Sequence, residues 1–489
     1  MAAPPTALRE YAVLLTGGIT LAASSWIFGG VEMWSLHSLL AGSALTFLLA
    51  VCPMPKACNG SDGEHGNKKN LLRLLRFPVF WSGLLLLLYI VLQASNPAWE
   101  LKRSEAGWWV EETAHIDWLP TSVEGEYDKM SAFRVLASFS AAFLLVWGLW
   151  TGIRRRRSAL LLLWALAISG TAMAMVGIIQ KFAGADAVLW SIKSANQHFW
   201  GSFYYRNQAV GYLVLILAAC AALYFYHYNR SEKTGQSGGP HLLLFTMIAL
   251  VAASIGLALS RGGILFGGVF LTGFLLLALL RWLLSFSTRQ SLLLSLVAVF
   301  LLGGAAWGAA RLIDYEAIQE RFGDIGKTIQ HVDLDARTLC TKITWKMAQE
   351  EPVFGWGAGS WRYIFPMYQK SYPRIFYTHY NKRKGWVGRK FFKEAHTDVV
   401  QFFFELGIVG SSLLLFGFLY WIFSLLFRSG GNFFSALAVL LGMAMAFGHA
   451  FVEFIFQSPA YWLAFNGLLC VAAKLLALER DRVYRSSAR

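Results

Sequence analysis

The chain has 489 residues, of which 56% are hydrophobic and only 15% are charged, and its mean hydropathy is +0.48. A water-soluble fold of this length needs far more polar surface, so the composition predicts an all-α polytopic membrane protein. The formal net charge of +15 does not require a nucleic-acid partner, because orientation in a membrane explains it more simply.

Predominantly apolar runs of roughly 18 to 22 residues recur along the chain, each long enough to cross a bilayer as a helix. We therefore predict about twelve transmembrane helices. They cover residues 11–29, 34–52, 78–93, 131–152, 160–179, 209–228, 242–259, 263–283, 291–310, 399–427, 434–451 and 461–478. The predicted organisation has three parts: nine spans in residues 1–310, a large, partly helical extracytoplasmic loop in residues 311–396, and three spans with a basic cytoplasmic tail in residues 397–489.

The Lys and Arg residues predict the orientation of these spans, because positive residues close to span ends resist translocation. Residues 56–76, the four arginines at 154–157 and the C-terminal tail fall on one side if both termini are cytoplasmic. The extracytoplasmic side then receives the loop 311–396, which is basic but long enough to translocate regardless of charge. Its end, NKRKGWVGRKFFKEAH, suits an anionic ligand embedded in the membrane, which predicts an active site on this side.

Two arginines lie at the predicted outer ends of spans. Arg206 follows the loop between the fifth and sixth spans, in NQHFWGSFYYRNQAVGYL, and Arg261 lies in SRGG between the seventh and eighth spans. Each can bind an anionic group at the membrane surface, and the glycines beside Arg261 permit a tight turn close to a ligand. Two alternatives stay open: Arg206 can extend to lipid headgroups, and Arg261 can be incidental to a hairpin turn.

The extracytoplasmic loop contains three further patterns. Leu339, Ile343 and Met347 recur every four residues and predict an amphipathic helix that Pro352 ends. The Gly-rich sequence FGWGAGSW at 354–361 indicates a structural turn. The tyrosines that follow stand among Arg and Lys residues and can stack on sugar rings or anchor in lipid headgroups. They are Tyr363, Tyr368, Tyr372, Tyr377 and Tyr380.

His396 precedes the tenth span, in AHTDVVQFFFELGIVG at 395–410. A ring nitrogen at the outer boundary can take up a proton near neutral pH, although a helix-start histidine bonded to backbone is the plain alternative. Glu405 in the same span is a functional candidate, since carboxylates inside membranes are rare. The helical repeat places Glu405 and His396 on opposite faces, so we expect Glu405 to meet a polar group on another helix.

The five cysteines do not indicate a disulfide framework, because only Cys340 falls in the extracytoplasmic loop. Cysteine and histidine do not cluster with the spacing of metal ligands. No metal site and no cofactor are therefore predicted.

Four segments together resemble the O-antigen ligase and O-antigen polymerase superfamily of bacterial envelope enzymes. They are YYRNQAVGYL at 204–213, SRGG at 260–263, DARTLCTKITWKMAQEEPVFGWGAGSW at 335–361 and AHTDVVQFFFELGIVG at 395–410. The likeness covers roughly residues 182–410 in order, with a similar number of spans and a large periplasmic loop late in the chain. The family usually has Asn after its His, where this chain has Thr397.

This resemblance implies a GT-C-like fold and a metal-independent, inverting glycosyl transfer at the periplasmic face of the bacterial inner membrane. The donor would be a glycan on undecaprenyl diphosphate, and the acceptor a sugar hydroxyl of lipid A-core. Arg206 and Arg261 would bind the departing diphosphate through bidentate contacts. His396 would deprotonate the acceptor hydroxyl or orient the diphosphate. Further substrate-binding candidates are Arg337, for which a helix-start salt bridge is the alternative, Lys382, Arg383, Arg389 and Tyr377.

Other functions stay open. A polymerase that joins lipid-linked repeats and an O-linked protein oligosaccharyltransferase use the same donor chemistry. A transporter or lipid flippase is the competing class, and it favours charges near mid-bilayer in both halves of the chain. The first four spans contain almost no central charge and the candidate groups gather on one face, which favours an enzyme over a transporter or an envelope scaffold.

Overall fold

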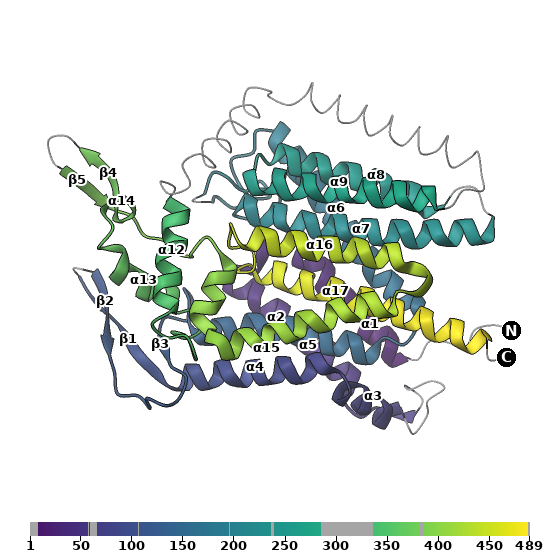
Figure 1. The fold of residues 1–489 in the computed structure, drawn as a ribbon, viewed down its shortest axis with the longest axis horizontal. Coiled ribbons are helices and arrows are strands. Elements are labelled where there is room, and N and C mark those ends of the chain that lie inside the picture. Colours follow the sequence, from purple (N-terminus) through teal and green to yellow (C-terminus); the bar gives the residue numbers. More distant parts are fainter. Residues whose placement is uncertain are drawn as a thin grey trace.

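The computed structural model describes residues 8–56, 58, 66–105, 107–194, 196–235, 239–284, 336–381 and 385–487. The expected span at 291–310, the predicted boundary between residues 310 and 311, and two substrate-binding candidates, Lys382 and Arg383, lie outside these residues. Figure 1 shows a bundle of long helices, with the five strands and α12–α14 at one end. The first helix begins, and the last helix ends, toward the opposite end (Figure 1).

Ten of the helices described are long and apolar enough to cross a membrane. They are α2 (Met33–Val51), α4 (Pro78–Ser95), α5 (Ala132–Gly152), α6 (Arg156–Phe182), α7 (Arg206–Thr234), α8 (Pro240–Leu257), α9 (Arg261–Leu283), α15 (Asp398–Arg428), α16 (Phe433–Ala450) and α17 (Pro459–Ser487). The multi-pass helical class is therefore confirmed, and each of these helices matches an expected span. The first expected span corresponds to the 17-residue α1 (Leu8–Ser24), which is followed by the short η1 (Phe28–Gly30).

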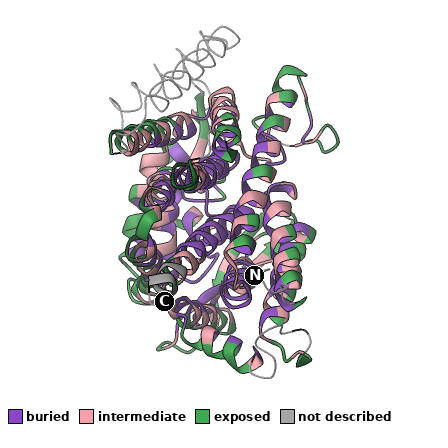
Figure 2. Cartoon of the chain, turned by 90° about the vertical axis from the view of Figure 1, so that its right-hand side faces the viewer, coloured by how far each residue is buried: buried purple, intermediate pink, exposed green. Residues whose placement is uncertain are grey.

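Helix α7 forms the centre of the bundle. In the most apolar 18-residue stretch of α7, 94% of the residues are buried. The corresponding shares in α9 and α15 are 22% and 28%. Lipid can cover an apolar helix as well as protein can, so this burial reflects packing and not composition. Helix α7 packs against α6, α8, α9, α16 and α17. In the end-on view of Figure 2, buried residues fill the interior and exposed residues cover the outer helix faces.

Helix α15 is interrupted two residues after Glu405. Gly407 has φ +60, which breaks the helical hydrogen-bond ladder at a buried position. The segment after α12 replaces the lost partners: Gly357 N–H donates to the Glu405 carbonyl at 3.0 Å, and Ile408 N–H donates to the Pro352 carbonyl at 2.9 Å. The Gly-rich sequence 354–361 is therefore a structural turn, as predicted, and it packs against this break in α15.

One end of the bundle, called the outer end below without reference to a side of the membrane, carries a small layer of mixed structure. The loop 95–130 forms β1 (Pro97–Ser104), β2 (Gly107–Glu112) and β3 (Ser122–Glu124), in the order β2-β1-β3, with β2 antiparallel and β3 parallel to β1. The later loop forms α12 (Ala336–Ala348), α13 (Trp361–Gln369), α14 (Pro373–Phe376) and an antiparallel hairpin of β4 (Tyr377–Asn381) and β5 (Gly385–Arg389). The sequence did not predict these strands.

The amphipathic helix predicted in the later loop is confirmed as α12. Ile343 and Met347 are buried, and Leu339 packs against the same core, which is separate from the core of the membrane helices. At the opposite end of the bundle lies the short helix α3 (Gly66–Leu75), in a basic connection. The layer of mixed structure thus has its own hydrophobic core, and this core positions the residues of the layer over the end of the helix bundle.

Candidate active site

A buried carboxylate, Glu453, collects three polar groups at the outer end of the bundle. It lies in the connection between α16 and α17, and its side chain is only 3% exposed. One oxygen, Oε1, accepts a hydrogen bond from Asn207 Nδ2 at 2.5 Å and an ion pair from the Arg337 guanidinium. The other oxygen, Oε2, lies 3.7 Å from Nδ1 of His396. Four segments far apart in the sequence therefore meet at one acid.

The starts of two membrane helices are joined beside this acid. Ser260 caps α9 by accepting a hydrogen bond from Gly263 N–H, and its hydroxyl donates to Asn207 Oδ1 at 2.7 Å. Asn207 is the second residue of α7, so the first residues of the two helices, Arg206 and Arg261, are held at the same end of the bundle. Helix N-termini carry partial positive charge, which adds to the charge of the two guanidinium groups.

The backbone of His396 is in a rare conformation. Its φ is +58, in the left-handed region that non-glycine residues adopt seldom and often at functional sites. The imidazole packs edge-on against the rings of Phe392 and Phe454, at centroid distances of 6.2 and 5.0 Å. Its side chain is 19% exposed, and Nδ1 has no hydrogen-bond partner among the described residues. Among the described residues, no backbone group therefore forms a hydrogen bond with Nδ1, as the alternative of a helix-start histidine would require.

The start of α15 fixes the segment that carries Glu453. Asp398 accepts hydrogen bonds from Phe456 N–H at 2.8 Å and from Gln457 Nε2 at 3.3 Å. Its own N–H donates to the Glu453 carbonyl at 3.3 Å. Because His396 lies two residues before Asp398, these bonds set the position of the imidazole relative to the carboxylate.

The electrostatics of the cluster favour a charged Glu453. Burial alone would raise the pKa of this carboxyl, but His396 and Arg337 outweigh burial and hold the pKa below its usual range. Tyr205 shows the opposite effect: burial, together with the nearby charge of Glu453, raises the pKa of its phenol to about 12. The cluster therefore holds a carboxylate beside the imidazole, and the nearby Tyr205 phenol keeps its proton at neutral pH.

A pocket of about 290 Å³ lies on the other side of Arg206. Lys181 at the end of α6 and His198 in the following loop also line it, so up to three positive groups share one small space. Gln180 lines it as well, and both polar atoms of its buried amide lack a hydrogen-bond partner among the described residues. This lining suits a compact anion.

The structure separates the sequence-predicted residues into two groups. Arg337 and His396 meet at Glu453, and Arg206 and Arg261 lie at the adjoining helix starts. The remaining candidates, Tyr377 and Arg389, lie on the β4–β5 hairpin, which projects away from the bundle (Figure 1). There Tyr377 stacks on Trp386, and Arg389 lies over the ring of Phe376 at 5.8 Å. These contacts do not bring the hairpin to the cluster.

Glu405 was expected to meet a polar group on another helix. Its carboxylate accepts hydrogen bonds from the backbone of Gly359 and of Trp361, the first residue of α13, and from the Gln401 side chain, one turn earlier on α15, at 3.0 Å. Glu453 was missed. It is the only acidic residue between Arg428 and Glu479, and a lone acid between two apolar spans is a signal that could have identified it.

Residues 243–415 match the model of a protein family described as O-Antigen ligase. This match supports the resemblance of the chain to the O-antigen ligase and polymerase superfamily. The match includes Arg261, Arg337 and His396, whereas Arg206 and Glu453 lie outside it. Family members are glycosyltransferases that act on lipid-linked glycans, which supports an enzymatic role for this multi-pass membrane protein. No curated protein matches the chain significantly.

Proposed function

We propose that the protein is an O-antigen ligase-like glycosyltransferase of the bacterial inner membrane. It would move a glycan from undecaprenyl diphosphate to a sugar hydroxyl of lipid A-core at the periplasmic face, with inversion and without a metal. The observation that carries the proposal is the meeting of His396, Glu453 and Arg337 beside the arginine-bearing starts of α7 and α9. This arrangement combines a proton acceptor with fixed cations at one end of a membrane bundle.

The cations would stabilise the leaving group. When the anomeric carbon–oxygen bond breaks, the diphosphate keeps the electron pair and accumulates negative charge. Arg206 and Arg261 are suited to this charge because a guanidinium can bind a phosphate through two parallel hydrogen bonds. The pocket that Arg206 shares with Lys181 and His198 supports placing the diphosphate on that side.

The imidazole would accept the proton of the acceptor. As the acceptor oxygen forms its bond to the anomeric carbon, His396 would take the hydroxyl proton through Nε2. The carboxylate of Glu453 faces the other nitrogen, Nδ1, and can hold the tautomer that leaves Nε2 able to accept. Arg337 forms an ion pair with Glu453, so we assign it to positioning that carboxylate.

A reconstituted transfer assay tests the proposal. Purified full-length protein in lipid vesicles would receive a glycan on undecaprenyl diphosphate and lipid A-core, and mass spectrometry would detect the covalent product. Ligase activity predicts glycosylated lipid A-core with release of undecaprenyl diphosphate. A longer lipid-linked glycan without added core would indicate a polymerase, and a glycosylated protein acceptor would indicate an oligosaccharyltransferase. Movement of the unchanged donor across the membrane, with no covalent product, would reject the transferase.

A further inference from the structure

A second, larger cavity lies next to the proposed active site. Its volume is about 950 Å³, at the upper end of the range of small-molecule sites. It is enclosed by the outer ends of α5, α7 and α15, the strands β1 and β2, and α13, and we call it the outer cavity. Tyr205 and Phe454 line it and stack on each other, with ring centroids 5.0 Å apart. Because Phe454 also contacts the imidazole of His396, the outer cavity adjoins the proposed active site.

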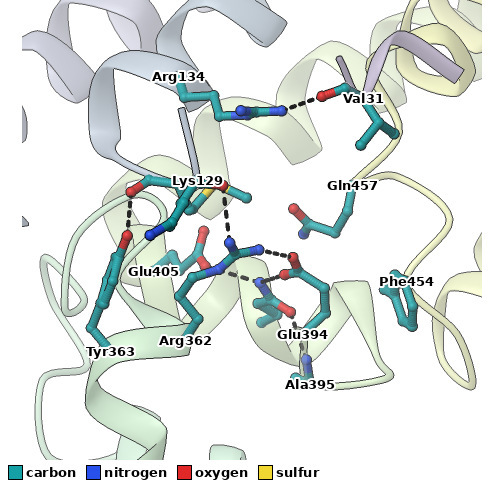
Figure 3. Close-up of polar contacts among 12 residues, drawn as sticks. Val31, Lys129, Arg134, Arg362, Tyr363, Glu394, Ala395, Glu405, Phe454 and Gln457 are labelled. Carbon is teal, nitrogen blue, oxygen red and sulfur yellow. Dashed lines mark hydrogen bonds and ion pairs between the residues drawn. The ribbon is translucent and has the colours of Figure 1, made fainter. Parts of the chain in front are cut away.

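One wall of the outer cavity is a network of buried charged and amide groups. The Arg362 guanidinium donates to Glu394 at 2.7 Å and to the Lys129 carbonyl at 2.9 Å (Figure 3). Gln401 Nε2 bridges the carboxylates of Glu394 and Glu405, at 2.9 and 3.0 Å. The side chains of Arg362 and Glu394 are only 13% and 9% exposed. The Arg362 Nε atom is buried without a hydrogen-bond partner among the described residues.

Another wall is aromatic. Trp108 on β2 meets Tyr363 of α13 and Phe391 edge-on, at centroid distances of 6.1 and 5.9 Å. Strand residues alternate between two faces, so Trp108 points into the outer cavity with Arg103, the residue opposite it on β1. Its neighbour Trp109 does not line the outer cavity and donates instead to Glu111 at 2.6 Å.

We propose that the outer cavity is a saccharide-binding site. Sugars present apolar C–H faces that stack on aromatic rings, and pairs of hydroxyls that planar guanidinium, carboxylate and amide groups can bind with two hydrogen bonds. Both kinds of group line the outer cavity. A lipid chain does not fit this lining, because it would remove water from the exposed charged groups of Lys129 and Lys393 without offering them hydrogen bonds.

The saccharide has two possible sources. It is either the glycan of the acceptor or the sugar repeat of the lipid-linked donor, and this assignment rests on the proposed glycosyl transfer. Binding itself can be measured without any transfer, so a failure of this inference is distinguishable from a failure of the proposed function.

Trp108 and Trp109 provide a matched pair of variants. They are adjacent on one strand and similarly exposed, 37% and 42%, but only Trp108 lines the outer cavity. Full-length wild-type, Trp108→Ala and Trp109→Ala proteins in nanodiscs would be titrated by calorimetry with two probes. The first is the oligosaccharide released from the bacterium's own lipid-linked donor, and the second is the oligosaccharide released from its lipid A-core.

We expect Trp108→Ala to weaken binding of one probe by on the order of 10-fold and Trp109→Ala to leave it unchanged. The probe that responds identifies the source of the saccharide. A double variant, Arg362→Gln with Glu394→Gln, removes both charges together and should abolish binding of the same probe. The inference is overturned if the wild type binds neither probe, or if the two tryptophan variants bind equally.

Discussion

Two buried carboxylates lie at opposite ends of the helix bundle, and their partners differ. Glu10, near the start of α1, accepts the backbone N–H groups of Arg154 and Arg155 with one oxygen, at 3.1 and 2.9 Å. Its other oxygen lies 3.8 Å from Nε of Arg155. Glu453 is equally buried, and the side chains of both are 3% exposed. Its Oε2, however, has no hydrogen-bond partner among the described residues and faces an imidazole nitrogen.

This difference makes Glu10 a structural residue and Glu453 a candidate for a role in catalysis. Backbone N–H groups cannot move a proton at neutral pH, so the contacts of Glu10 can only hold the turn before α6. An imidazole can gain or lose a proton, and a neighbouring carboxylate sets its tautomer. Glu10 and Glu453 are equally buried acids. The group that each carboxylate contacts therefore decides which end of the bundle is suited to catalysis.

The largest expected effect is at His396. His396→Ala should reduce glycan transfer by about 10²- to 10⁴-fold while the protein still folds and inserts, because a general base contributes about that much. Initial rates of the purified variant on the lipid-linked donor would measure it. His396→Asn can hydrogen-bond but cannot take a proton at neutral pH, so a near wild-type rate for it would leave only an orienting role. Full activity of both variants would reject this site.

The arginines at the helix starts should give the next largest effect. Arg206→Lys or Arg261→Lys keeps the charge but loses the planar, two-bond geometry. The activation free energy should therefore rise by about 2–3 kcal/mol, which lowers the transfer rate roughly 30- to 150-fold. Arg155→Lys, at the other carboxylate, is the matched control and should transfer normally. Wild-type turnover in both helix-start variants, at equal protein level, would mean that these arginines only extend to lipid headgroups.

The two carboxylates can be compared directly. Glu453→Gln removes the charge that holds Arg337 and faces His396, and loss of one charge-assisted hydrogen bond should lower transfer by about 10-fold. Glu453→Asp keeps the charge and should recover part of that loss. Glu10→Gln should instead lower the melting temperature and leave the rate per folded molecule unchanged. If Glu10→Gln lowers that rate as much as Glu453→Gln, the distinction between the two acids is wrong.

The sidedness of the two ends gives a labelling prediction. In a background without Cys52 and Cys58, a cysteine at exposed Arg389 should react with an impermeant thiol reagent in intact cells. A cysteine at exposed Lys69, on α3 at the other end, should react only after the membrane is opened. The reverse pattern would put the His396 cluster in the cytoplasm.

The smallest expected effect is that of a chelator. Because protein guanidinium groups would supply the positive charge at the diphosphate, transfer should be unchanged in EDTA. The assay would compare rates before and after exhaustive chelation. Abolished transfer that a divalent ion restores would show that a metal takes part in the reaction.

The sequence by itself determined the features that depend on neighbouring residues. Lipid requires apolar segments of helical length, so hydropathy located the spans, and a repeat of four residues located α12. Motif likeness pointed to the starts of α7 and α9 and to His396. The tertiary structure decided the pairings: Glu453 with Arg337 and His396, Asn207 with Ser260, and the Gly-rich turn with the break in α15. It also separated the β4–β5 hairpin from the cluster. The reason is physical: a buried polar group needs a partner, and helix packing over the whole chain determines which residue comes within reach.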